Sequence, residues 1–202
     1  MNKPIIAVGG VGGSGTRVVA SFLSAMGLPI GVDLNDPLDD LWFTLLFKRR
    51  EIFQAVDEID SAWRLFKMAR SAPRSLRASE AAWVRELCRQ DRPFQKSGWL
   101  KMRADSLLDY LDHGPATSTQ TWAWKEPNTH IVIDRLLHLE PSLRYIHVVR
   151  NGLDMAFSGN QQQVNFWGPG VLSIPTVPQE PRVSLSYWVR VHQRMMDVAR
   201  SF

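Results

Sequence analysis

The spacing of hydrophobic positions changes along the chain and predicts its elements. Four short apolar runs predict buried strands, at 5–8, 29–32, 121–125 and 145–149. Apolar residues then recur three and four positions apart in stretches that predict helices, at 16–26, 129–139, 153–158 and 184–202. A Gln-, Gly- and Pro-rich stretch at 161–181 is expected to be irregular.

The stretch between the second and third strands has helical periodicity throughout. Asp36 and Pro37 provide a capping acid and a proline for the first helical turn, so we expect a helical insertion at about 36–113. The order of elements predicts an α/β fold, a three-layer parallel sheet with flanking helices, in one domain over 1–202. Ligands of such sheets bind beyond the carboxyl ends of the strands.

The composition bounds the class of protein. A chain of 202 residues can bury a sizeable core. Its single cysteine, Cys88, excludes an internal disulfide and a cysteine-based zinc site, and it suits a reducing compartment. The apolar run at 5–8 is too short for a signal peptide, and no run approaches the roughly 20 residues of a membrane helix. We therefore expect a cytoplasmic protein without a membrane partner.

Positive charge is concentrated in the predicted insertion. Residues 64–103 hold eleven Lys or Arg and three acids, although the whole chain carries only +4. A solvated helical surface is the favoured interpretation. The alternative is a non-catalytic binding module for a polyanion such as an acidic glycan, with nucleic acid the less favoured partner.

A glycine-rich turn, 9–15, follows the first strand and can wrap backbone N–H groups around an anion. The glycines at 10, 12 and 15, with Asp33 18 residues after Gly15, match a dinucleotide fingerprint. This pattern alone favours an oxidoreductase that binds NAD(P) or FAD. The turn also has the glycine spacing of a Walker loop, but Thr16 stands where that loop needs lysine, so triphosphate hydrolysis is disfavoured.

Two further groups follow later strands. Lys125 ends the third predicted strand. Arg150 ends the fourth, and Ser158 lies eight residues further, at the end of a short predicted helix. A guanidinium and a hydroxyl can hold a second anion. Because all these positions fall at strand ends, one shared site is expected.

Taken together, the three motifs resemble the sulfotransferase family. Ser14-Gly15-Thr16 resembles its 5′-phosphosulfate loop, Arg150 with Ser158 its 3′-phosphate motif, and Lys125-Glu126-Pro127 its Lys-x-Pro segment. The resemblance implies a P-loop-like fold. It also implies transfer of a sulfuryl group from 3′-phosphoadenosine 5′-phosphosulfate to a hydroxyl or amine, without a metal.

The same resemblance implies roles for individual residues. The backbone of Gly12 to Thr16 would hold the 5′-phosphosulfate, and Lys125 would stabilise the transferred group. The family usually has a cation where this chain has Gly13, so Arg17 or Lys125 is expected to supply that charge. A carboxylate would act as the general base: Asp33 is the first choice and Glu126 the second.

The acceptor is expected to be a small molecule or a carbohydrate, and the sequence does not indicate the oligomeric state. Four tryptophans could stack on sugar rings, but core positions are favoured for them: Trp99, Trp122, Trp124 and Trp167. The segment 166–168 is the candidate acceptor-side lid. The family usually has a further strand and loop downstream, so we expect the domain to be truncated at its C-terminus.

Overall fold

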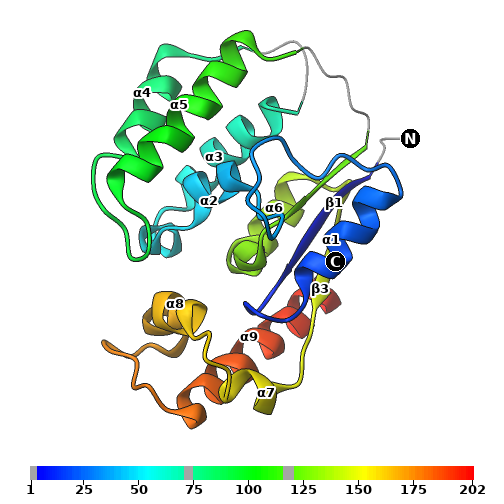
Figure 1. Ribbon diagram of the computed structural model, residues 1–202, viewed down its shortest axis with the longest axis vertical. Helices are drawn as coiled ribbons and strands as arrows, with labels where there is room; N and C mark the ends of the chain where they lie inside the picture. Colours follow the sequence, from blue (N-terminus) through cyan, green and yellow to red (C-terminus); the bar gives the residue numbers. More distant parts are fainter. Residues whose placement is uncertain (1–3, 71–74, 116–120) are drawn as a thin grey trace.

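Three parallel strands form the sheet in the computed structural model, which describes residues 4–70, 75–115 and 121–202. The strands are β1 (Ile5–Gly10), β2 (Trp122–Lys125) and β3 (Leu143–Val148), in the order β2-β1-β3. Ala7 of β1 lies opposite Trp124 of β2 and Tyr145 of β3. Because the strands are parallel, their carboxyl ends meet at one edge (Figure 1). The predicted α/β class with a parallel sheet is confirmed.

The predicted strand at 29–32 is wrong. In the described residues this segment runs as irregular chain beside β2, and the Ala123 N–H donates to the Pro29 carbonyl at 2.8 Å. Proline has no N–H to donate in return, so a ladder of paired residues does not develop here.

Helices cover both faces of the sheet. Helix α1 (Thr16–Ala25) packs on one face, where Ala20 meets Ala123 and Ile30. The other face carries an aromatic core in which Phe66 lies 5.4 Å, between ring centroids, from Trp124. Burial of rings of this size supplies much of the apolar area that stabilises the domain.

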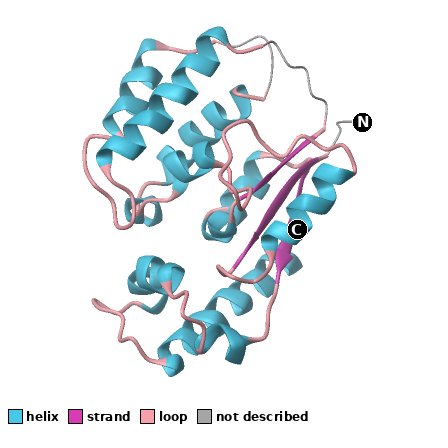
Figure 2. Ribbon diagram, viewed as in Figure 1, coloured by secondary structure: helices cyan, strands magenta, loops and turns pink. Residues whose placement is uncertain are grey.

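The predicted helical insertion is confirmed, with a later start. It consists of α2 (Leu41–Phe47), the 3-10 helix η1 (Arg50–Phe53), α3 (Val56–Met68), α4 (Ala78–Glu86) and α5 (Ser97–His113). Asp36 and Pro37 lie in the turn that precedes it, and the cap is Asp40, whose carboxylate accepts from the Phe43 N–H at 3.0 Å. Figures 1 and 2 show these helices gathered on one side of the sheet.

The chain after β2 is also mostly helical. It forms the 3-10 helix η2 (Pro127–Ile131), then α6 (Ile133–Leu139), α7 (Gly152–Ala156), α8 (Gln162–Leu172) and α9 (Pro181–Ser201). The prediction of irregular structure at 161–181 is wrong over α8. Phe166 and Trp167 give that helix a buried apolar side. Pro169 lies inside the helix, near its end, and does not terminate it, since the helix continues to Leu172.

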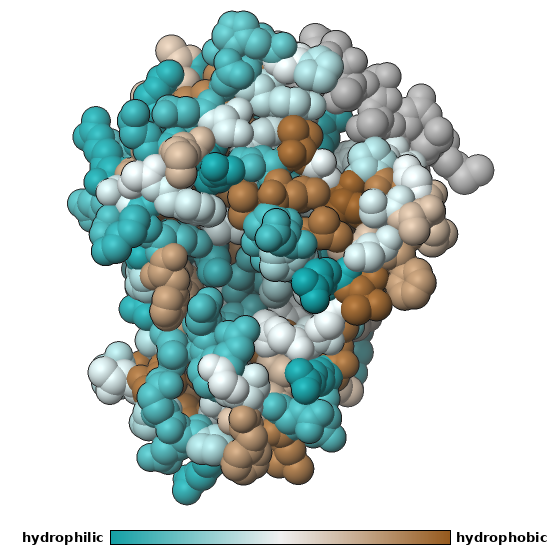
Figure 3. Space-filling model, in the orientation of Figure 1, coloured by the Kyte–Doolittle hydropathy of each residue, from teal (hydrophilic) through white to brown (hydrophobic). Residues whose placement is uncertain are grey.

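The basic stretch 64–103 is largely neutralised by acids. Arg103 pairs with Asp33 at 2.7 Å, Lys96 with Asp91 at 2.8 Å, and Arg70 is buried against Asp40. Figure 3 shows a mostly hydrophilic surface over this part of the molecule, with hydrophobic atoms gathered nearer its middle. Within the described ranges, every helix falls short of the length and hydrophobicity needed to cross a bilayer.

Candidate functional site

The glycine loop, residues 9–15, links β1 to α1 at the carboxyl edge of the sheet. Gly13 and Gly15 have φ values of +87° and +97°, which side chains rarely tolerate. The first-turn N–H groups of α1 have no intrahelical partner, and they carry the positive end of the helix dipole. The Ser14 hydroxyl is buried and finds no partner in the described residues. The loop therefore offers donors suited to an anion.

The side chain of Gln163 on α8 fixes the shape of this loop. Its Oε1 accepts from the Gly12 N–H at 2.8 Å, and its Nε2 donates to the Gly10 carbonyl at 3.3 Å. The Gly12 N–H, expected to hold the donor, is thus already bonded in this conformation. The Ser14 N–H donates to the Val11 carbonyl at 3.1 Å, so among the described residues the amides of Gly13, Gly15 and Thr16 are left to face an anion.

A cavity of about 480 Å³ opens in front of the loop; we call it the loop cavity. It brings together most of the site residues expected from the sequence: Gly12, Gly13, Gly15, Thr16, Arg17, Lys125 and Glu126. The parallel sheet explains this convergence, since Lys125 ends β2 next to the carboxyl end of β1.

Lys125 is almost fully buried, at 3% exposure. Its ammonium forms an ion pair with Asp39 and donates to the Pro37 carbonyl at 3.0 Å. The positive charge of Lys125 is therefore balanced within the protein, while one of its three protons remains available to the cavity.

Glu126 is equally buried, at 2% exposure. Asn128 donates to both carboxylate oxygens at 2.6 Å, from its backbone N–H and its side-chain amide. Burial raises the pKa of the Glu126 carboxyl to about 7, against the opposing effects of the Lys48 charge and the Asn128 hydrogen bonds. A carboxyl with a pKa near neutrality is suited to accept a proton.

A second cavity, of about 440 Å³, lies toward the helical insertion; we call it the insertion cavity. Phe94 and Trp99 line it, and Phe94 is held exposed in the left-handed region at φ +68°. Four residues line both this cavity and the loop cavity: Asp39, Lys48, Glu126 and Gln162. The two cavities therefore meet at Glu126, and we call this place the junction.

Asp33, the first choice for the base, lies outside the linings of both cavities. Its carboxylate accepts from Arg103 at 2.7 Å and from the Ser106 hydroxyl at 3.2 Å. The dinucleotide interpretation needs Asp33 at the end of a strand beside the glycine loop. No strand forms there in the described chain, so that interpretation loses its acidic partner.

The structure brings Arg150 against the glycine loop. Its Nη1 donates to the Gly13 carbonyl at 3.3 Å, and its guanidinium lies 3.7 Å from Asp154. Ser158 follows α7 and lines a separate cavity of about 220 Å³, where its hydroxyl accepts from the Asn160 N–H at 3.2 Å. The two motif residues thus flank α7, with Arg150 linking that turn to the loop.

Sequence reasoning missed several residues of the site, among them Asp39, Lys48, Asn128, Gln162 and Gln163. Asp39 belongs to a visible acidic run after the segment 29–32, and Lys48 to the run Lys48-Arg49-Arg50. Neither run shows which member faces the cavities. The Asn128 Oδ1 accepts from Gln163 at 2.8 Å and from Trp167 at 2.7 Å. These residues are far apart in the sequence, so no local pattern predicts their network.

The candidate lid at 166–168 is wrong, because Phe166 and Trp167 are each 1% exposed within α8. Trp122 and Trp124 are also buried, so the core interpretation holds for these tryptophans. Only Trp99, of the four stacking candidates, is half-buried and lines a cavity.

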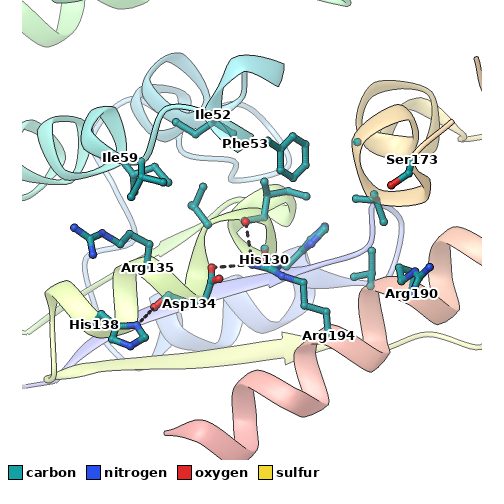
Figure 4. A pocket seen from close by; sticks show the side chains of 16 residues that line it. Ile52, Phe53, Ile59, His130, Asp134, Arg135, His138, Ser173, Arg190 and Arg194 are labelled. Carbon is teal, nitrogen blue, oxygen red and sulfur yellow. Dashed lines mark hydrogen bonds and ion pairs between the residues drawn. The ribbon is translucent and has the colours of Figure 1, made fainter. Parts of the chain in front are cut away.

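A further cavity of about 670 Å³, larger than the loop and insertion cavities, lies on the far side of η2, between α6, α9 and η1 (Figure 4). Arg194 pairs with Asp134 within its lining at 2.7 Å, and Arg135 pairs at 2.7 Å with Asp60, which lies outside the lining. His130 lines it and meets the His147 ring edge to face, at 6.3 Å between ring centroids. In the part of the chain that is described, no group of three or more His, Cys, Asp or Glu is placed to hold a metal.

No curated protein sequence matches this chain significantly. The model of the Sulfotransferase family matches residues 4–202, a span that includes the glycine loop, Lys125 and Arg150. The match covers nearly the whole chain, and the protein therefore belongs to the sulfotransferase family.

Proposed function

We propose that this protein transfers a sulfuryl group from 3′-phosphoadenosine 5′-phosphosulfate to a hydroxyl or amine of a small ring-bearing acceptor. The observation that carries the proposal is the junction. An anion-binding loop opens into one cavity, an aromatic-lined cavity lies beside it, and the buried Glu126 carboxyl faces both.

The donor would bind with its 5′-phosphosulfate on the glycine loop. The amides of Gly13, Gly15 and Thr16 and the unpartnered Ser14 hydroxyl fit such a group, because they are hydrogen-bond donors and the loop holds no acid to repel it. The 3′-phosphate would lie toward Arg150, whose guanidinium is half exposed on the opposite flank of the loop. Ser158 would add a hydrogen bond.

The acceptor would occupy the insertion cavity, with its ring against Phe94 and Trp99. Its reacting hydroxyl would point to Glu126. In the transfer step the acceptor oxygen forms a bond to sulfur while the bond from sulfur to the phosphate oxygen breaks, and its electron pair stays on that phosphate. The hydroxyl proton passes to the Glu126 carboxylate.

The catalytic contribution of the protein is positioning and charge. The leaving phosphate gains negative charge as the bond to sulfur breaks, so preorganised donors around it lower the barrier. Gly13, Gly15, Thr16 and Lys125, which would supply these donors, all line the loop cavity.

Two measurements test the proposal. Adenosine 3′,5′-bisphosphate should raise the melting temperature and NAD(H) should not. Transfer of ³⁵S from the labelled donor should be detected with at least one member of a panel of phenols, sugars and aryl amines. Stabilisation by NAD(H) alone, or binding of the bisphosphate without transfer to any of these classes, would contradict the proposed function.

A further inference from the structure

Three consecutive cations follow α2, and the structure uses two of them to hold the fold. The buried Arg49 pairs with Glu58 at 2.5 Å, and its Nε donates to the Leu46 carbonyl at 3.1 Å. Arg50 reaches α8, where it donates to the carbonyls of Phe166 at 2.9 Å and Asn165 at 3.0 Å.

Lys48 differs from both of its neighbours. Over the described residues its ammonium has no ion pair and no hydrogen bond, and its one aromatic neighbour is the Phe166 ring, whose centroid lies 6.0 Å away. The side chain is half-buried and lines both the loop cavity and the insertion cavity. Its charge acts on the buried Glu126 carboxyl, whose pKa it lowers. Lys48 is therefore a cation at the junction that makes no direct ion pair with any described residue.

The site needs such a cation. The glycine loop has no charged residue, and at Gly13 the φ of +87° disfavours a lysine side chain. Lys125 is balanced by Asp39. Arg17 lines the loop cavity but is exposed to solvent, where its field is screened.

We propose that Lys48 is a catalytic residue, and that its ammonium binds the sulfuryl oxygens while the group crosses from donor to acceptor. This inference rests on the proposed function. The bond changes are those given above, and Lys48 keeps its protons throughout. Arg49 and Arg50 position it, because they fix the end of α2 against α3 and α8.

The test compares Lys48→Met with Lys48→Arg and with Lys101→Met. Lys101 is an exposed lysine of α5, 3.6 Å from Asp105 and outside both cavities, so it controls for loss of a positive charge. We expect Lys48→Met to lower kcat by about 10²–10³-fold, as for removal of one charge-stabilising group. Lys48→Arg should recover part of this loss, and Lys101→Met should retain the wild-type kcat.

Binding and titration separate this role from donor binding and from misfolding. Adenosine 3′,5′-bisphosphate lacks the sulfuryl group. In Lys48→Met, the fold loss of affinity for this nucleotide should therefore be at least ten times smaller than the fold loss of kcat. The Glu126 pKa, followed by infrared difference spectroscopy without any substrate, should rise in Lys48→Met. A kcat within threefold of the wild type, an equal loss of bisphosphate affinity, or an unchanged Glu126 pKa would overturn the inference. If the wild type transfers no sulfuryl group, although it folds and shows the Glu126 shift, the proposed function has failed instead, and the catalytic role with it.

Discussion

The side-chain oxygen of Gln163 accepts a hydrogen bond from the backbone N–H of Gly12 at 2.8 Å. The same side chain donates to the Gly10 carbonyl and to Asn128, so helix α8 is tied to the glycine loop and to the Glu126 network. Gly12 and Gln163 are 151 residues apart in the sequence. A side-chain amide from a distant helix thus sets the shape of a loop that has no charged residues.

Replacing Gln163 with alanine should therefore loosen the loop. Two buried polar groups, the Gly10 carbonyl and the Asn128 Oδ1, and the partly buried Gly12 N–H would lose a partner, and we expect the free energy of unfolding to fall by about 1–3 kcal/mol. For a domain of this size each kcal/mol corresponds to about 2–4 °C in melting temperature. Scanning calorimetry measures the shift. Gln193→Ala, at an exposed position bonded only to Asp197 at 3.5 Å, is the matched control. Equal shifts in the two variants would show that the network carries no stability.

The Glu126 carboxyl should set the acid limb of the activity. Burial raises its pKa to about 7, so below that pH the carboxyl is protonated and cannot accept the acceptor's proton. We expect kcat/KM to fall about tenfold per pH unit below pH 7. Glu126→Gln should lower kcat by about 10²–10⁴-fold and remove this limb, while bisphosphate binding persists. Glu86→Gln, at an exposed helix position, should behave as the wild type. An acid limb that survives in Glu126→Gln places the base elsewhere.

The strand-end residues could be predicted from the sequence because they depend on local patterns. An apolar run followed by glycines, by Lys125 or by Arg150 marks the carboxyl end of a strand, and a parallel sheet brings these ends together. The structure places Lys125 in the loop cavity and Arg150 against the Gly13 carbonyl accordingly.

The features of the site that could not be predicted from the sequence depend on contacts between distant segments. Asp33 looked like a carboxylate at a strand end, but it lies 2.7 Å from Arg103, 70 residues away. The Gln-rich segment looked irregular because glutamine carries no apolar periodicity, yet Gln163 is held by hydrogen bonds to Gly10, Gly12 and Asn128. Such contacts leave no spacing in the sequence to detect.

Arg150 should discriminate between nucleotides. Its guanidinium is free to bind a 3′-phosphate, since its partners are the Gly13 carbonyl at 3.3 Å and the weakly held Asp154 at 3.7 Å. We expect Arg150→Ala to weaken binding of adenosine 3′,5′-bisphosphate about tenfold or more, and to leave adenosine 5′-phosphate binding nearly unchanged. Isothermal titration calorimetry gives both affinities. Arg144→Ala, an exposed arginine earlier on β3, serves as the control. If Arg150→Ala weakens both nucleotides equally, the 3′-phosphate lies elsewhere.

Three histidine rings meet between β3, η2 and α9. His147 lies 6.3 Å from His130 and 5.0 Å from His192, between ring centroids, and the Nε2 atoms of all three are buried without a partner among the described residues. Burial lowers the pKa of His147 to about 4 and also lowers the pKa of the other two. In the unfolded chain these histidines have an ordinary pKa near 6.5. Below that pH the unfolded chain therefore binds more protons than the folded protein does.

This difference should make the fold acid-sensitive. For His147 the contribution to stability is complete above about pH 6.5 and is lost as the pH falls toward 4, by about 1.4 kcal/mol per pH unit; the lowered pKa values of His130 and His192 act in the same direction. Urea unfolding at several pH values should show a shallower fall for His147→Asn than for the wild type. His113→Asn, at an exposed position, should keep the wild-type slope. The raised pKa of Glu126 acts in the opposite direction, but it is common to all three proteins and cancels at each pH. If the free energy of unfolding falls with pH equally steeply in His147→Asn and in the wild type, His147 does not contribute to the acid sensitivity.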